Sequence, residues 1–195
     1  VPKDKIEAAK WYRLAAEQGD ANGQFNLGTI YDYGKGLLED NAEAFKWYML
    51  AAEQGNTDGQ NNIGFMYDHG EGVPENKAEA EKWYQLAAEQ GDVDAVFNLA
   101  KLYYFQGRYV EAEPLYKQAI VHGEKSYGLN DPKLAENLTD LALLYHDQGH
   151  NSEAEPLYRR SLIINEKFYG SNHPNISVSL NNLASLYHDQ GRYVE

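Results

Sequence analysis

The chain has 195 residues, and its 30 acidic against 17 basic side chains give a formal net charge of −13. Nucleic acids and anionic membrane surfaces need a basic patch on the protein, so this charge argues against both as partners. There is no cysteine to form a disulfide or thiolate metal site, and no apolar run approaches the roughly 18 residues that span a bilayer. We therefore expect a soluble protein without membrane insertion, whereas the absence of cysteine does not choose between cytoplasm and periplasm.

A nine-residue string dominates the first half of the chain. Its form, Trp-Tyr-x-Leu-Ala-Ala-Glu-Gln-Gly, begins at Trp11, Trp47 and Trp83, so the copies are 36 residues apart. A fixed period of this length is typical of a solenoid, in which each unit buries its apolar face against its neighbours. Residues 1–92 are therefore predicted to form one repeat array, with the recurrent tryptophans as core residues.

Each unit of this array is predicted to be a pair of antiparallel helices. The first helix carries apolar residues at i, i+3 and i+4, as in Leu27, Ile30 and Tyr31. The second helix carries the tryptophan string and ends at a glycine such as Gly55, which can take the positive φ that closes a helix. The residue that follows, here Asn56, is a good cap for the next first helix.

A second period, of 42 residues, follows from residue 93. The string Glu-Ala-Glu-Pro-Leu-Tyr occurs at 111–116 and again at 153–158. Its prolines, Pro114 and Pro156, are expected in or near the first turn of their helices, where the missing N–H costs little. The six additional residues per repeat should lengthen the helices by somewhat over one turn.

The two arrays are predicted to form one continuous solenoid of about ten helices, because the segment 94–106 aligns with both series. The repeat types then divide the chain into 1–92 and 93–195. Val1-Pro2 matches a segment in the middle of a later repeat, and the chain stops at Glu195, where the next second helix should begin. We therefore expect a solenoid that is truncated at both ends.

At these strings the chain resembles known repeat families. The 36-residue unit, with Trp-Tyr-x-x-Ala-Ala-Glu-Gln-Gly and Asn-Leu-Gly-x-x-Tyr, resembles the Sel-one-like repeat of the tetratricopeptide class. The 42-residue unit, with Asn-Leu-Ala-x-Leu-Tyr and Glu-Ala-Glu-Pro-Leu-Tyr, resembles the tetratricopeptide repeats of kinesin light chain. Two residues depart from the patterns: Leu38 replaces a loop proline, and Asp140 replaces an asparagine. The resemblance implies an all-α, right-handed superhelix that serves as an adaptor or scaffold for other proteins.

In tetratricopeptide solenoids the first helix of each unit lines the concave wall. A projection at about 100° per residue places many acids and several exposed aromatic side chains on this wall. We hypothesise a groove for an extended peptide or a partner helix, and in its sharper form a partner that carries Lys or Arg. The other interpretation is that the acids are only the solvated face of an acidic protein. The predicted groove residues are Asp32, Asn61, Phe65, Asp68, Asp94, Phe97, Lys101, Tyr104, His146, Asn181 and His188.

One position of the first helices carries a column of asparagines. The column comprises Asn26, Asn62, Asn98 and Asn182, with Asp140 in the remaining unit. Such amides can bind the main chain of a peptide, or they can tie a helix to a neighbouring backbone group. A second column, of His146 and His188, would make binding sensitive to pH.

Catalytic motifs are missing from the sequence. It has no phosphate loop, no His-Glu-x-x-His and no Gly-x-Ser-x-Gly. Gly149 should end the helix between His146 and His150, so their spacing does not favour a metal site. We predict no catalytic residue, metal or cofactor. Two alternatives to the scaffold are an accessory module that positions a domain outside this sequence and a self-assembling structural array.

Overall fold

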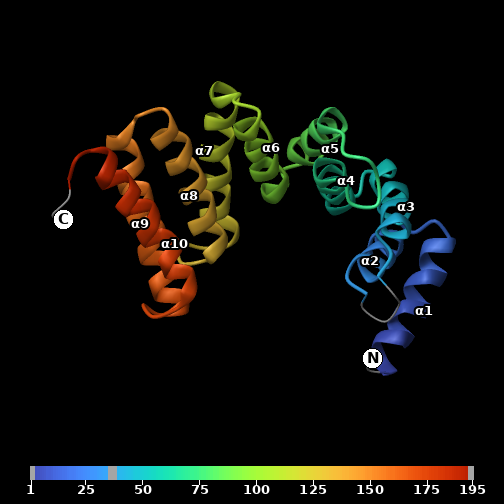
Figure 1. Cartoon of the computed structure of the whole chain (residues 1–195). Coiled ribbons are helices and arrows are strands. Elements are labelled where there is room, and N and C mark those ends of the chain that lie inside the picture. The colour runs from blue at the N-terminus through green and yellow to red at the C-terminus, as the bar shows by residue number, and fades with distance from the viewer. Residues whose placement is uncertain (1–2, 35–38, 193–195) are drawn as a thin grey trace. The chain divides into compact units, whose positions relative to one another are not determined.

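The computed structural model describes residues 3–34 and 39–192, which form ten α-helices and no strand (Figure 1). The predicted all-α fold of paired helices is confirmed. Val1, Pro2 and Leu38, which the sequence analysis used, lie outside the described residues. The chain divides into two compact units, Val1–Leu102 and Tyr103–Glu195.

The first unit contains the 36-residue repeats. Its helices are α1 (Lys3–Glu17), α2 (Ala21–Asp32), α3 (Asn41–Glu53), α4 (Thr57–His69), α5 (Lys77–Glu89) and the greater part of α6 (Val93–Phe105). From α1 to α5, each helix packs against the next one in sequence: α2 contacts α1 and α3, and α4 contacts α3 and α5. These contacts are those of stacked helix pairs.

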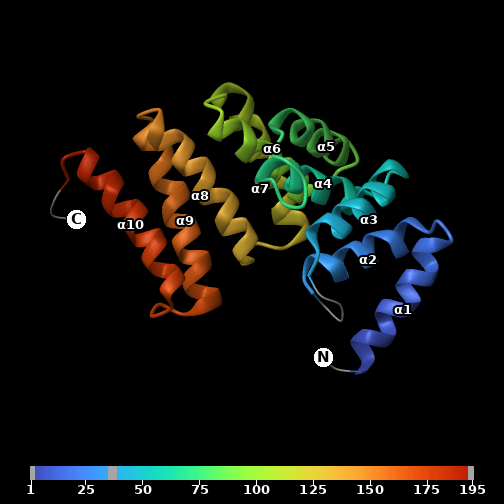
Figure 2. The same ribbon diagram turned by 45° about the vertical axis from the view of Figure 1, so that its right-hand side comes forward.

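The second unit contains the 42-residue repeats. Its helices are α7 (Tyr109–Ser126), α8 (Pro132–Asp147), α9 (Asn151–Tyr169) and α10 (Pro174–Asp189) (Figure 2). They have 16 to 19 residues, against 12 or 13 for α2 to α5, as the longer period predicts. α8 packs against α7 and α9, and α9 packs against α10. The division between the units falls inside α6, and the continuity of the solenoid across it stays a prediction.

The helix ends follow the predicted chemistry. Gly55 has a φ of 85°, and the side chain of Asn56 accepts a hydrogen bond of 2.8 Å from the backbone N–H of Gly59. Asp20 and Asp92 cap α2 and α6 in the same way. These caps satisfy backbone donors that the first turn of a helix cannot pair internally.

The glutamine of the repeated Glu-Gln-Gly ending takes part in a ladder of hydrogen bonds between helices. Gln54 donates to the side-chain oxygen of Gln24 over 2.6 Å, and Gln24 donates in turn to the carbonyl of Ala16 over 3.3 Å. The same arrangement recurs one repeat later. α2 and α4 are each thereby bonded to the second helix before them and to the second helix after them.

In the second and third Trp-Tyr pairs the tyrosine is buried more deeply than the tryptophan. Tyr48 and Tyr84 are fully buried, whereas Trp11 is 64% exposed and both Trp47 and Trp83 are only partly buried. The prediction that the tryptophans are core residues is therefore wrong for Trp11 and overstated for the other two. Adjacent residues differ by about 100° around a helix, so only one of the pair can point into the helix layer.

Two helical glycines make room for these tyrosine rings. A Cβ added to Gly28 would lie 2.6 Å from Cδ1 of Tyr48, and a Cβ added to Gly64 would lie 2.6 Å from Cδ1 of Tyr84. Glycine costs about 1 kcal/mol relative to alanine inside a helix. The close approach of the first helix to the tyrosine explains why glycine occupies both positions.

The two prolines lie deeper in their helices than predicted. Pro114 is the sixth residue of α7 and Pro156 is the sixth residue of α9. A proline at this point cannot donate to the carbonyl four residues earlier, which for α7 is that of Val110. Val110 is 86% exposed, so this turn of α7 lies at the surface of the protein. The helices begin earlier than expected because the turns before them are short.

Buried tyrosine hydroxyl groups differ between the units in a way that stability measurements can detect. The Tyr48 hydroxyl donates to Asp32, whereas the Tyr158 hydroxyl is buried with no hydrogen-bond partner among the described residues. We expect Tyr48→Phe to lower the free energy of unfolding by about 1 kcal/mol, and Tyr158→Phe to leave it unchanged or raise it. Urea denaturation measures both; equal losses at the two positions would contradict this assignment.

Candidate functional site

A hollow of about 320 Å³ opens in the first unit and brings predicted groove residues together. It is lined by residues of α2 and its C-cap, of α3, α4 and α6, and of the loop after α4. These residues are Asp32, Tyr33, Tyr48, Asn61, Asn62, Phe65, Met66, Glu71 and Asn98. Asp32, Asn61 and Phe65 are three of the predicted groove residues, and they come from two successive first helices.

The inner end of the hollow is built on a buried tyrosine. The hydroxyl of Tyr48 lies 3.1 Å from Oδ2 of Asp32, to which it donates, and 3.2 Å from Oγ1 of Thr29. Burial raises the pKa of Tyr48 far above its ordinary value, so the hydroxyl keeps its proton. The bond holds the Asp32 carboxylate in one orientation at the end of α2.

Asparagine amides form one wall of the hollow. Asn98 on α6 donates to the side-chain oxygen of Asn61 on α4 over 3.0 Å. Asn62 makes no hydrogen bond with the described part of the chain, and it faces the same hollow. Asn26, by contrast, donates to the carbonyl of Asn22 in its own helix. The asparagine column therefore has a structural role at position 26 and borders the hollow at positions 62 and 98.

An aromatic pair lies at the outer end of α4. Phe65 is 39% exposed, and its ring stacks on the ring of His69 with the centroids 4.0 Å apart and the planes inclined by 24°. The backbone carbonyl of Phe65 lies 3.0 Å from Nδ1 of His69, which fixes the imidazole against the ring. Phe65 thus presents a supported aromatic surface to a ligand.

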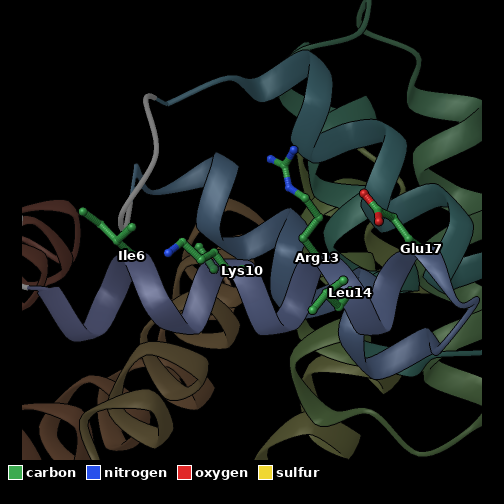
Figure 3. A pocket seen from close by; sticks show the side chains of 6 residues that line it. Ile6, Lys10, Arg13, Leu14 and Glu17 are labelled. Carbon is green, nitrogen blue, oxygen red and sulfur yellow. The ribbon is translucent and has the colours of Figure 1, made fainter.

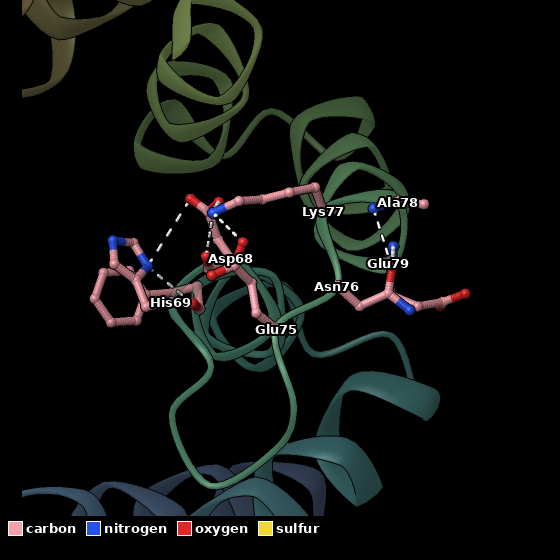
Figure 4. Close-up of polar contacts among 8 residues, drawn as sticks. Asp68, His69, Glu75, Asn76, Lys77, Ala78 and Glu79 are labelled. Carbon is pink, nitrogen blue, oxygen red and sulfur yellow. Dashed lines mark hydrogen bonds and ion pairs between the residues drawn. The ribbon is translucent and has the colours of Figure 1, made fainter. Parts of the chain in front are cut away.

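Asp68 does not line this hollow, and its carboxylate forms an ion pair with Lys77 (Figure 4). Nζ of Lys77 is 2.9 Å from Oδ1 of Asp68 and 3.3 Å from Oε1 of Glu75, and it also donates to the carbonyl of Asp68. The Asp68 side chain is only 15% exposed. Its charge is used to join the end of α4 to the start of α5.

Phe97 is not the exposed aromatic residue that the helical projection predicts. Its ring is only 8% exposed, and Nζ of Lys101, one turn later on α6, lies 5.2 Å from the ring centroid. Side chains four residues apart on a helix are neighbours, so one can shield the other from solvent. A helical projection does not account for this shielding. Asp94 and Asn181, the latter exposed, also lie outside the hollow.

The groove positions predicted in the second unit form a ladder between successive first helices. Tyr104 donates to the carboxylate of Asp147, and 42 residues later Nε2 of His146 lies 2.9 Å from Oδ2 of Asp189. His188 is 73% exposed, with Nδ1 3.2 Å from Oδ1 of Asp189. The two imidazoles, His188 first and His146 second, hold the pKa of the Asp189 carboxyl below its ordinary value. These side chains therefore bind one another, and His188 also lines a separate hollow of about 520 Å³ in the second unit.

A larger hollow, of about 580 Å³, opens in the second unit between residues of α8, α9 and α10. It includes two members of the asparagine column, Asp140 and Asn182, together with Asn165 and Tyr169 from the end of α9. The full lining is Pro132, Lys133, Ala135, Glu136, Thr139, Asp140, Leu143, Asn165, Tyr169, Asn175, Val178, Ser179 and Asn182. The helical projection considered first helices only, so it could not select a residue of a second helix such as Asn165.

The sequence also gives little sign of three lining residues of the first hollow. Tyr48 and Met66 are buried core residues whose edges reach it. Glu71 lies between Gly70 and Gly72, which have φ values of 71° and 69°. The Gly-x-Gly pattern marks this loop, but only the folded chain brings its middle residue beside α2.

A further hollow, of about 520 Å³, follows one side of α1 (Figure 3). Its lining includes Ile6, Ala9 and Leu14, flanked by the charged side chains of Lys10 and Arg13. Ile6 and Leu14 are 43% and 48% exposed. This apolar surface is the one to which the hypothesis of a self-assembling array applies.

Two further properties concern the described residues alone. No group of three or more His, Asp or Glu side chains among them could hold a metal ion. None of their helices combines the length and the apolar character that a membrane crossing demands.

The helical pairs and their strings match two repeat families. The tetratricopeptide repeat matches residues 92–167 and 153–195, and the Sel1 repeat matches residues 1–20, 21–56 and 57–92. The chain belongs to the tetratricopeptide repeat family. Sel1 repeats build its amino-terminal part and tetratricopeptide repeats its carboxyl-terminal part, which confirms the predicted order. No protein of curated function matches this sequence.

The structure of this chain is similar to solved structures of other repeat proteins. The Sel1 repeat protein of Oxalobacter formigenes is 33% identical with a TM-score of 0.65, over 80% of this chain and 63% of its own. BtubC (BKLC) of P. vanneervenii is 19% identical with a TM-score of 0.75, over 97% and 82% of the two chains. YrrB is 17% identical with a TM-score of 0.69, over 95% and 87%. The chain thus spans less than two thirds of the Sel1 repeat protein, and the last two similarities concern the fold alone.

Proposed function

We propose that this protein-interaction scaffold binds an extended peptide segment in the hollow of its first unit. Tetratricopeptide and Sel1 repeats bind protein or peptide partners, and families of such repeats are typically non-catalytic scaffolds. The observation that carries the proposal is the meeting of Asp32, Asn61 and Phe65, from two first helices, around one hollow.

The amide wall suits a peptide main chain. An asparagine side chain offers both a donor and an acceptor, as does each peptide unit of an extended segment. Asn62 faces the hollow without a bond to the described residues, so it can pair with such a segment whatever its sequence. Phe65 and Met66 provide apolar contact beside it. YrrB, which shares the fold, is itself a tetratricopeptide repeat protein with an unusual peptide-binding site.

The charge around the hollow favours a cationic partner. Among the described residues that line it, Asp32 and Glu71 are charged, and both are acidic. The chain as a whole carries a net charge of −13, which attracts basic segments before contact. Binding to such a partner should weaken as salt is added, because exposed charges are screened.

The test is the affinity of the full chain for an arrayed library of basic peptides, with two asparagine variants. We expect Asn62→Ala to weaken binding about tenfold, which corresponds to about 1.4 kcal/mol. Asn26→Ala, at the same column position but bonded to its own helix, is the matched control and should bind normally. Full affinity in the Asn62 variant, or affinity that is indifferent to ionic strength, would contradict the proposal.

A further inference from the structure

We infer that the hollow of the first unit is a pocket for a single arginine side chain of the bound segment. The inference rests on the proposed function and names the residue that this site selects. Three properties of the hollow carry it: its size, the two acidic side chains that line it and its aromatic wall.

The size of the hollow suits one long side chain. Pockets for whole small ligands range from about 300 to about 1,000 Å³, and this hollow has about 320 Å³. Met66 and Phe65 line part of it, which gives the aliphatic stem of a long side chain an apolar surface. A long cationic side chain can thereby bury its stem while its charged group reaches the acids.

The two acids of the hollow are fixed in different ways, Asp32 through its side chain and Glu71 through its backbone. The hydroxyl of buried Tyr48 fixes Asp32 at the end of α2. Glu71 lies in the loop after α4, and its own backbone N–H donates to the carbonyl of Met66 over 3.0 Å. A Cβ on the neighbouring Gly72 would overlap the carbonyl of Asn41, so this loop lies directly against the start of α3. Neither lysine nor arginine is among the described residues that line the hollow.

The distribution of acceptors favours arginine over lysine. Asp32, Asn62 and Glu71 offer oxygen atoms from three separate segments around one space. A guanidinium has five N–H donors spread in a plane and stacks on aromatic rings, whereas an ammonium is a compact and strongly hydrated charge. Phe65, supported from one side by His69, provides the ring.

The experiment uses the full chain and four pools of random nonapeptides whose central residue is arginine, lysine, citrulline or alanine. We expect the arginine pool to bind at least about tenfold more tightly than the citrulline pool, which has the same shape without the charge. Glu71→Gln should abolish most of this preference. Asp68→Asn removes one negative charge nearby, outside the hollow, and should preserve it.

The outcomes separate the inference from the proposed function. Equal binding of the arginine and citrulline pools, or of the arginine and lysine pools, overturns the arginine pocket and leaves peptide binding standing. Equal loss of preference in the Glu71 and Asp68 variants overturns it as well, since general charge would then explain the effect. Binding to none of the pools overturns both. Thermal unfolding of each variant confirms that the compared proteins are folded.

Discussion

Alanine in place of Gly64 is expected to lower the free energy of unfolding by about 1–3 kcal/mol, and alanine in place of Gly123 to raise it by up to about 1 kcal/mol. Both glycines lie inside helices, so both substitutions gain the same helix propensity. At Gly64 the new Cβ would lie 2.6 Å from the fully buried ring of Tyr84, which has no room to retreat. At Gly123 the nearest atom would lie 3.5 Å away, at ordinary contact distance.

Urea denaturation of the two variants and the parent chain measures these changes. Gly28→Ala serves as a repeat of the experiment, because its Cβ would meet the ring of Tyr48 at the same 2.6 Å. It should destabilise the chain by a similar amount. Changes of the same sign at Gly64 and Gly123 would show that helix propensity, and not the close approach of the tyrosine, decides the outcome.

Features that depend on neighbours in sequence could be predicted well. The glycine and cap residues at helix ends, such as Gly55 and Asn56, act within a few residues, so their spacing is enough to place them. The helix pairs also follow from one periodic pattern repeated along the chain. Both units contain these helix pairs. In repeat proteins, the stability comes from contacts within a repeat and between adjacent repeats, so one repeated pattern is enough to predict them.

Features that depend on orientation or on distant partners could not be predicted. Repetition marks both residues of Trp83-Tyr84 equally, and only the packing distinguishes the buried tyrosine from the half-buried tryptophan. Asp68 lies on the face that the projection selects, but its charge is paired by Lys77 from the next helix. In the candidate site, the first helices supply Asp32, Asn61 and Phe65, whereas Glu71 comes from a loop whose path the repeat period does not predict.

The distinction between tyrosine and tryptophan leads to the largest expected loss of stability. Tyr84→Ala should lower the free energy of unfolding by about 3–5 kcal/mol, the range for removal of a buried aromatic side chain. Trp83→Ala removes a larger side chain that is only partly buried, and we expect a loss of about 1 kcal/mol. Urea denaturation of both variants measures the difference. Equal losses would show that Trp83 contributes as much to the core as Tyr84 does.

A double-mutant cycle between Gly64 and Tyr84 joins the two predictions. If the tyrosine ring is what forbids a Cβ at position 64, removal of the ring must also remove the penalty. In the Tyr84→Ala background we therefore expect Gly64→Ala to become stabilising by up to about 1 kcal/mol, as helix propensity alone would make it. If Gly64→Ala still lowered the free energy of unfolding in the Tyr84→Ala background, a contact other than the Tyr84 ring would require the glycine. Reversal of its sign would locate the close helix contact of the Sel1 repeat in this single pair of residues.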